Sequence, residues 1–87
     1  MNAIMTVSLG RSGVKIKTAR IFTDPRAAWE YALLLQQNDE TSYCGFYLLS
    51  SDKKATKMKT DPTRHNDDPW DGFPDFMREL EKRKWIL

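Results

Sequence analysis

The sequence is poor in the side chains on which many enzymes and secreted proteins depend. Its 87 residues include one cysteine, Cys44, and one histidine, His65. A single cysteine excludes a disulfide within the chain and, with no signal-peptide pattern, predicts a reducing, cytoplasmic location. Cys44 lies in the apolar stretch SYCGFYLL, so we expect it to be a buried core residue rather than a catalytic thiol.

Long hydrophobic runs are also missing, as is a strong excess of one charge. The apolar runs are a few residues long, far short of the roughly 20 that cross a bilayer, so the sequence predicts no membrane span. The formal net charge is +2, but the charges come in blocks, basic in 1–22 and 53–59 and acidic in 61–75. Such blocks predict surface patches of both signs, which suit partner selection and steering.

The hydrophobic pattern predicts a hairpin followed by a helix. Residues 3–9 and 14–22 alternate around the turn sequence GRSG, and two-residue periods that flank a glycine-bearing turn are typical of paired strands. In the next segment Thr23 or Asp24 can cap a helix and Pro25 fits its first turn. Ala28, Ala32 and Leu35 then form a helical stripe, which predicts a helix over 24–37.

The second half repeats this order with a longer connection. Residues 42–50 are continuously apolar and predict a central strand, whereas 54–60 alternate with lysines and predict an edge strand. The segment 61–74 is rich in proline and aspartate and predicts a loop. A second helix is expected from Asp75, with Glu79 and Arg83 as an i, i+4 ion pair. The chain is therefore expected to form one α+β domain (1–87), a four-stranded, mainly antiparallel sheet in the order β-β-α-β-β-α with the first helix on one face.

Catalytic and cofactor motifs find little support in the sequence. GRSG lacks the ending of a phosphate-binding P-loop and precedes a strand. His65, Asp67, Asp68 and Asp71 offer metal-ligand atoms, but Pro69 interrupts a calcium-loop pattern and zinc would need more His or Cys. We therefore expect no enzyme activity, no metal and no cofactor.

Two surfaces are candidates for binding macromolecules. Trp70 and Phe73 stand among aspartates on a proline-stiffened segment, where they either close the core or form a contact for a basic protein partner. The residues of this predicted protein-binding site are Asp67, Asp68, Trp70, Asp71 and Phe73. The alternative is a basic sheet face that binds nucleic acid. Its residues are Lys15, Lys17, Lys53, Lys54, Lys57 and Lys59.

The chain is expected to contain a hairpin, a helix that opens with FTDPRAAW and then a second hairpin, and roughly residues 14–50 carry a resemblance to known proteins. In this order of elements the chain resembles small single-domain proteins of phages and mobile elements that bind and block host machinery, anti-CRISPR proteins among them. The resemblance implies a non-catalytic inhibitor of a host defence complex. The sequence leaves open whether the chain is a monomer or a homodimer. The alternative of a nucleic-acid-binding protein stays open.

Overall fold

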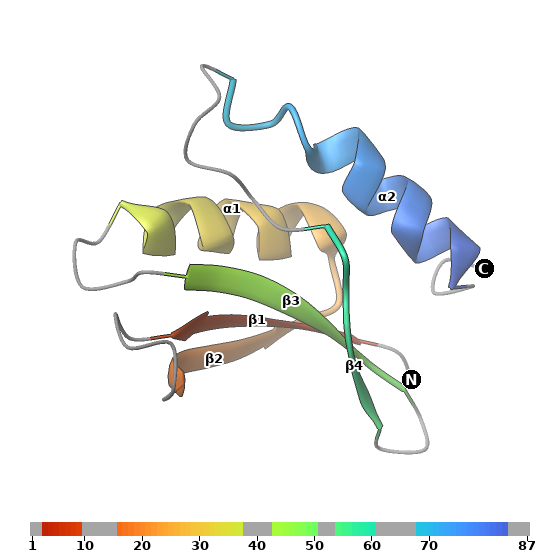
Figure 1. Ribbon diagram of the computed structural model, residues 1–87, viewed down its shortest axis with the longest axis horizontal. Coiled ribbons are helices and arrows are strands. Elements are labelled where there is room, and N and C mark those ends of the chain that lie inside the picture. Colours follow the sequence, from red (N-terminus) through yellow and green to blue (C-terminus); the bar gives the residue numbers. More distant parts are fainter. Residues whose placement is uncertain (1–2, 10–15, 38–42, 51–53, 61–67, 84–87) are drawn as a thin grey trace.

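The computed structural model describes residues 3–9, 16–37, 43–50, 54–60 and 68–83. Within them lie four strands and two helices (Figure 1). In chain order these are β1 (Ala3–Leu9), β2 (Ile16–Phe22), α1 (Pro25–Gln36), β3 (Tyr43–Leu49), β4 (Ala55–Lys57) and α2 (Phe73–Lys82). The strands form one antiparallel sheet in the order β2-β1-β3-β4. The predicted α+β fold and element order are confirmed.

The sheet register places β1 and β3 in the centre and β2 and β4 at the edges. Ile4 of β1 lies opposite Phe22 of β2 and Leu48 of β3. β3 is thus an interior strand, as its continuous apolar sequence predicts. The pairing of β1 with β2 steps from Ser8↔Thr18 to Leu9↔Ile16, so Lys17 has no partner on β1. This irregularity interrupts the strict alternation predicted for 14–22.

Helix α1 begins and ends within one residue of the predicted range 24–37, and one of the two predicted capping residues starts it. Asp24 is the N-cap, and its Oδ1 accepts a hydrogen bond from the Arg26 amide at 3.1 Å. Two small residues, Ala28 and Ala32, are fully buried against the sheet. The close approach lets the buried Thr6 hydroxyl donate to the Ala28 carbonyl at 3.4 Å, which satisfies a polar group inside the core.

The core is organised around Trp29 of α1, which is 1% exposed. Its ring stacks on Phe46 of β3 with centroids 5.6 Å apart and also contacts Phe76 of α2 at 5.2 Å. Its indole N–H donates to the Pro69 carbonyl at 3.0 Å, which ties α1 to the segment before α2. One aromatic side chain therefore joins the sheet and both helices.

Helix α2 packs on the same face of the sheet as α1, through Phe76 and Leu80 (Figure 1). It begins at Phe73, two residues before the predicted start, so the prediction of a loop over 61–74 is wrong for its last two residues. Pro74 is tolerated because the first turn of a helix needs no amide donor there, and Phe73 is fixed against Trp29 at 5.7 Å.

Strand β4 is shorter than the predicted strand 54–60, which is wrong beyond Lys57. Met58 turns into the core, where it is 1% exposed. The next two amides, those of Lys59 and Thr60, donate to the Glu79 carboxylate of α2 instead of to a neighbouring strand. The ladder ends where a side chain from α2 offers better acceptors.

Neither α1 nor α2, the helices of the described part of the chain, is long and apolar enough to cross a membrane.

Candidate functional site

The turn that leads into α2 carries the residues predicted for protein binding. Its backbone is ordered locally: the Trp70 amide donates to Asp68 Oδ1 at 2.9 Å, and the Asp71 amide donates to the Asp68 carbonyl at 3.1 Å. We name Asp68, Trp70, Asp71 and Phe73 the acidic aromatic surface. Asp67, predicted together with them, lies outside the described residues.

Trp70 packs against the core but stays partly exposed. It is half-buried, with its ring 6.5 Å from Trp29 and 5.1 Å from Phe73, so part of it closes the core. The Arg26 guanidinium lies 5.2 Å from its ring centroid, a cation–π distance. The Trp70 ring is thereby held between Trp29, Phe73 and Arg26, and the residue as a whole is only partly buried.

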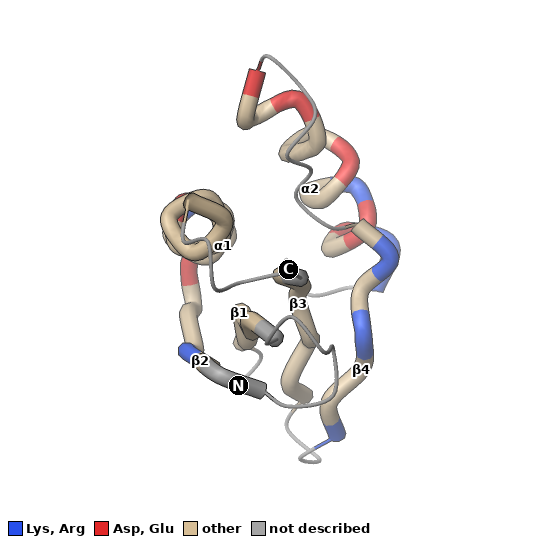
Figure 2. Tube along the Cα trace, turned by 60° about the vertical axis from the view of Figure 1, so that its left-hand side comes forward, with Lys and Arg blue, Asp and Glu red and all other residues tan. Residues whose placement is uncertain are grey.

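The carboxylates around Trp70 face solvent. Asp68 and Asp71 are exposed, and Asp75 follows in the first turn of α2, where a negative charge complements the helix dipole. Figure 2 shows acidic segments in this turn and along α2, whereas basic segments follow β4 towards the end of α2. The two sets of charge therefore meet along this helix.

The lysines of the predicted basic face are only partly brought together. Lys54, Lys57 and Lys59 lie on or beside β4, at one edge of the sheet. Lys17 belongs to β2 at the opposite edge, roughly 14 Å away at the usual strand spacing, and its side chain is not described. Lys57 lies opposite Tyr47 on the helix-free face, with its ammonium 5.8 Å from that ring. Lys15 and Lys53 lie outside the described residues.

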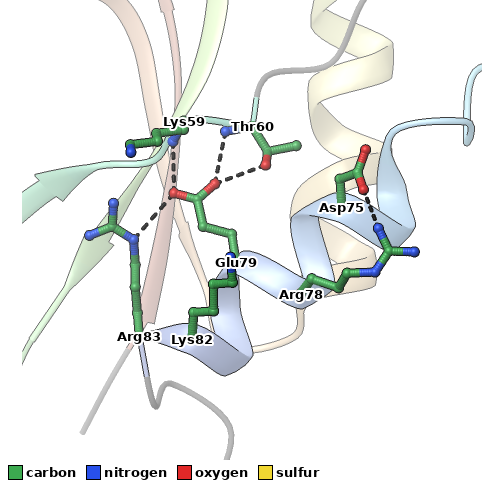
Figure 3. A pocket seen from close by; sticks show the side chains of 7 residues that line it. All are labelled: Lys59, Thr60, Asp75, Arg78, Glu79, Lys82 and Arg83. Atoms are coloured by element: carbon green, nitrogen blue, oxygen red, sulfur yellow. Dashed lines mark hydrogen bonds and ion pairs between the residues drawn. The ribbon is translucent and has the colours of Figure 1, made fainter.

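A surface pocket of about 510 Å³ lies between the residues that follow β4 and the outer side of α2 (Figure 3). Four cations, two carboxylates and one threonine line it. These residues are Lys59, Thr60, Asp75, Arg78, Glu79, Lys82 and Arg83. We name it the β4–α2 pocket.

Glu79 is the structural centre of this pocket. Its Oε1 accepts from the amide and the hydroxyl of Thr60, both at 2.8 Å, and its Oε2 accepts from the Lys59 amide at 2.8 Å and from Arg83 Nε at 3.2 Å. Burial raises the pKa of Glu79, but these hydrogen bonds outweigh it and bring the pKa below its ordinary value. The carboxylate is therefore ionised at neutral pH and engaged with this part of the chain.

The cations of the pocket are less completely matched. Arg78 pairs with Asp75, and Arg83 pairs with Glu79. No carboxylate of the described residues pairs with the Lys59 or Lys82 ammonium, and Figure 3 draws no link from either ammonium. The pocket therefore holds positive charge that its own acids do not neutralise.

The described side chains offer little for catalysis. Cys44 is buried, as the sequence predicts, and its thiol donates to the Ala32 carbonyl at 3.9 Å. Among residues with described side chains, no three His, Cys, Asp or Glu form a group that could hold a metal ion. His65 lies outside the described residues.

Sequence reasoning finds Glu79 and Arg83 only as a helix pair, which is confirmed at 3.2 Å. It misses their link to Lys59 and Thr60, which are 20 and 19 residues from Glu79. It also misses that Arg78 and Lys82 share a pocket with Lys59. The available signal is the clustering of basic residues in the second half of this helix.

No protein-family model, no curated protein and no solved structure matches this chain.

Proposed function

We propose that this chain is a non-catalytic binding protein whose acidic aromatic surface contacts a protein partner with a basic surface. The observation that carries the proposal is the half-buried Trp70, fixed by Trp29 and Phe73 and flanked by exposed Asp68 and Asp71. A tryptophan that is already ordered loses little conformational freedom on binding. Tryptophan is also enriched at the energetic centres of interfaces.

The charges support a basic partner rather than an acidic one. Asp68 and Asp71 are exposed and close to Trp70 in the chain, and acidic side chains there would speed encounter with positive charge and disfavour acidic surfaces. The resemblance of residues 14–50 to small phage and mobile-element proteins extends the proposal to a host defence complex as the partner that is blocked.

Binding is proposed in place of catalysis because the carboxylate beside the Thr60 hydroxyl, that of Glu79, also accepts from two backbone amides and Arg83, and its lowered pKa makes it a weak base. The thiol of Cys44 is buried and bonded to a backbone carbonyl. An activated nucleophile needs a base within hydrogen-bond reach and an open path for the substrate.

The proposal is tested by affinity capture of the partner from a nuclease-treated host lysate, followed by measurement of its dissociation constant. Asp71→Lys reverses an exposed charge of the acidic aromatic surface and should weaken binding at least ~10-fold. Glu81→Lys makes the same change at the far end of α2, where the side chain is also exposed, and should leave the affinity unchanged. Equal affinities for Asp71→Lys and the unchanged protein would refute the assigned surface.

A second candidate, nucleic-acid binding, is favoured by one observation. Lys54, Lys57 and Lys59 lie on or beside the edge strand β4, and Lys59 lines one pocket with Lys82 and Arg83. Figure 2 shows basic segments along β4 and towards the end of α2. Affinity for a thymidine oligonucleotide should then fall steeply with salt, and Lys54→Ala with Lys57→Ala should reduce the salt slope. A salt-independent or unmeasurable affinity would eliminate this candidate.

A further inference from the structure

The β4–α2 pocket has a chemical character that the acidic aromatic surface does not share. Its cations come from two segments that are far apart in the sequence: Lys59 lies beyond β4, and the others are Arg78 and Lys82 of α2 and Arg83, which caps that helix. Its volume of about 510 Å³ lies within the roughly 300–1,000 Å³ of small-molecule sites. A concave site with cations on two walls can surround a ligand, whereas cations along a single strand can contact only one side of it.

The carboxylates in the pocket leave this positive charge in place. Glu79 receives four hydrogen bonds, three of them from Lys59 and Thr60, so both of its oxygens are already used. Asp75 pairs with Arg78 at the other side of the pocket. The ammonium groups of Lys59 and Lys82 have no carboxylate partner among the described residues and remain as donors for an incoming anion.

The charge balance identifies the class of anion. Four cations and two carboxylates line the pocket, which leaves a net charge of +2. A phosphate monoester carries about −1.5 to −2 at pH 7 and three strong acceptor oxygens. We propose that the β4–α2 pocket binds the terminal phosphate of a small phosphate monoester, with Lys59 and Lys82 as its principal donors.

Arg78 and Arg83 have supporting roles in this site. Each guanidinium uses one of its N–H groups on a carboxylate, Arg78 Nη1 on Asp75 and Arg83 Nε on Glu79. Because a guanidinium has five N–H donors, each arginine keeps others for the phosphate oxygens. Glu79 does not contact the ligand in this arrangement: it positions the backbone of Lys59 and the side chain of Arg83.

This site is independent of the proposed protein-binding function, which uses residues at the other end of α2. Loss of phosphate binding says nothing about the acidic aromatic surface, and loss of partner binding in Asp71→Lys says nothing about the pocket. The proposed site also differs from the nucleic-acid-binding candidate, because its ligand is the single terminal phosphate of a small molecule and not the backbone of a nucleic acid.

The test is a titration of the full chain, labelled with ¹⁵N, with adenosine 5′-monophosphate, inorganic phosphate and adenosine in separate arms. The amides of Lys59 and Thr60 are the reporters, because both are hydrogen-bonded to Glu79 inside the pocket. Saturable shifts of these amides are expected with the two phosphates and no shift with adenosine. Shifts that grow linearly with every anion, or no shift at all, would overturn the proposal.

A matched set of variants locates the site. Lys59→Ala with Lys82→Ala removes the two unmatched charges and should weaken binding of adenosine 5′-monophosphate at least ~10-fold, because charge-assisted hydrogen bonds are the strong ones. Lys54→Ala removes an exposed lysine that does not line the pocket and should change the affinity less than ~2-fold, as expected of a distant screened charge. A thermal unfolding midpoint equal to that of the unchanged protein is expected for the double variant and shows that it is folded.

Two results of this set would overturn the assignment. Equal weakening by Lys54→Ala and by the double variant would mean that the ligand responds to the general positive field and not to this pocket. Tighter binding of a thymidine oligonucleotide than of adenosine 5′-monophosphate, with shifts at the same amides, would show that the pocket binds nucleic acid instead of a small phosphate monoester.

Discussion

The two ends of α2 are attached to the rest of the protein in opposite ways. At its start, Phe73, Phe76 and the preceding Trp70 pack their rings around Trp29. Towards its end, the Glu79 carboxylate receives the backbone amides that follow β4. One attachment removes apolar surface from water and the other satisfies polar groups at the end of a strand.

The contrast shows how each end divides its residues between folding and binding. At the start of α2 the aromatic rings stabilise the fold, and the aspartates beside them remain at the surface. Towards the end the acid, Glu79, stabilises the fold, and the ammonium groups beside it remain at the surface. The side chains left exposed are acidic beside Trp70 and include the lysines of the pocket beside Glu79.

The largest loss of stability is expected at the aromatic end of α2, where the fully buried Trp29 contacts the partly buried Trp70. Trp29→Ala removes a fully buried ring and its hydrogen bond to Pro69, so it should reduce the free energy of unfolding by about 3–5 kcal/mol. Trp70→Ala should cost about 1–2 kcal/mol, since half-burial gives only part of the hydrophobic gain. Urea unfolding measures both, and equal losses would contradict the central role of Trp29.

A smaller loss is expected at the polar end. Glu79→Ala leaves the amides of Lys59 and Thr60 without their acceptor and should reduce the free energy of unfolding by about 2 kcal/mol. The matched control is Asp75→Asn, in the ion pair with Arg78 whose side chains are 67% and 69% exposed. It should cost under ~0.5 kcal/mol, as exposed pairs do. Comparable losses for the two variants in urea unfolding would mean that Glu79 is no more than a surface charge.

The glycine between the two aromatic residues at the start of α2 gives a prediction of smaller size. A Cβ at Gly72 would lie 3.1 Å from Trp29 Cη2, so alanine there requires the indole to move. Because Trp29 is held by several rings and by Pro69, Gly72→Ala should destabilise the fold by about 1 kcal/mol. Stabilisation in urea unfolding, as expected of alanine replacing glycine near a helix start, would show that this end is packed more loosely.

The local parts of this architecture could be predicted from the sequence. Alternation indicates the first hairpin, Asp24 and Pro25 indicate the start of α1, and continuous apolar residues indicate the interior strand β3. Each of these signals is contained within a few neighbouring residues. The exact starts and ends follow less well, because beyond Met58 the amides of Lys59 and Thr60 leave the sheet and donate to Glu79 of a distant helix.

The contacts that build the candidate sites join residues far apart in the chain. The hydrogen bond from Trp29 to Pro69 spans 40 positions, and those to Glu79 span about 20. The sequence shows that Trp70 lies among acidic residues, but it does not indicate that the Trp70 ring packs against Trp29. Sequence patterns indicate that Arg78, Lys82 and Arg83 are basic residues of a helix. They do not indicate that Lys59 lines the same pocket.

The smallest expected effect is a pH dependence of the free energy of unfolding that comes from Glu79, at one end of α2. It is small because burial raises the pKa of Glu79 while its hydrogen bonds lower it. The net shift lowers the pKa in the folded state. The stabilisation is therefore complete above the unfolded-state pKa, near 4.5, and is lost as the pH falls through the lower folded-state pKa. Glutamine at this position keeps much of the shape but does not titrate.

The free energies of unfolding of the unchanged protein and of Glu79→Gln should differ at pH 7 and converge as the pH falls below about 4.5. Because all other carboxylates titrate equally in both proteins, the difference between them isolates this one group. The same comparison for Trp70→Phe should be independent of pH, since neither ring titrates in this range. A constant gap between the unchanged protein and Glu79→Gln from pH 7 to pH 3 would show that geometry, and not the charge of Glu79, holds this end of α2.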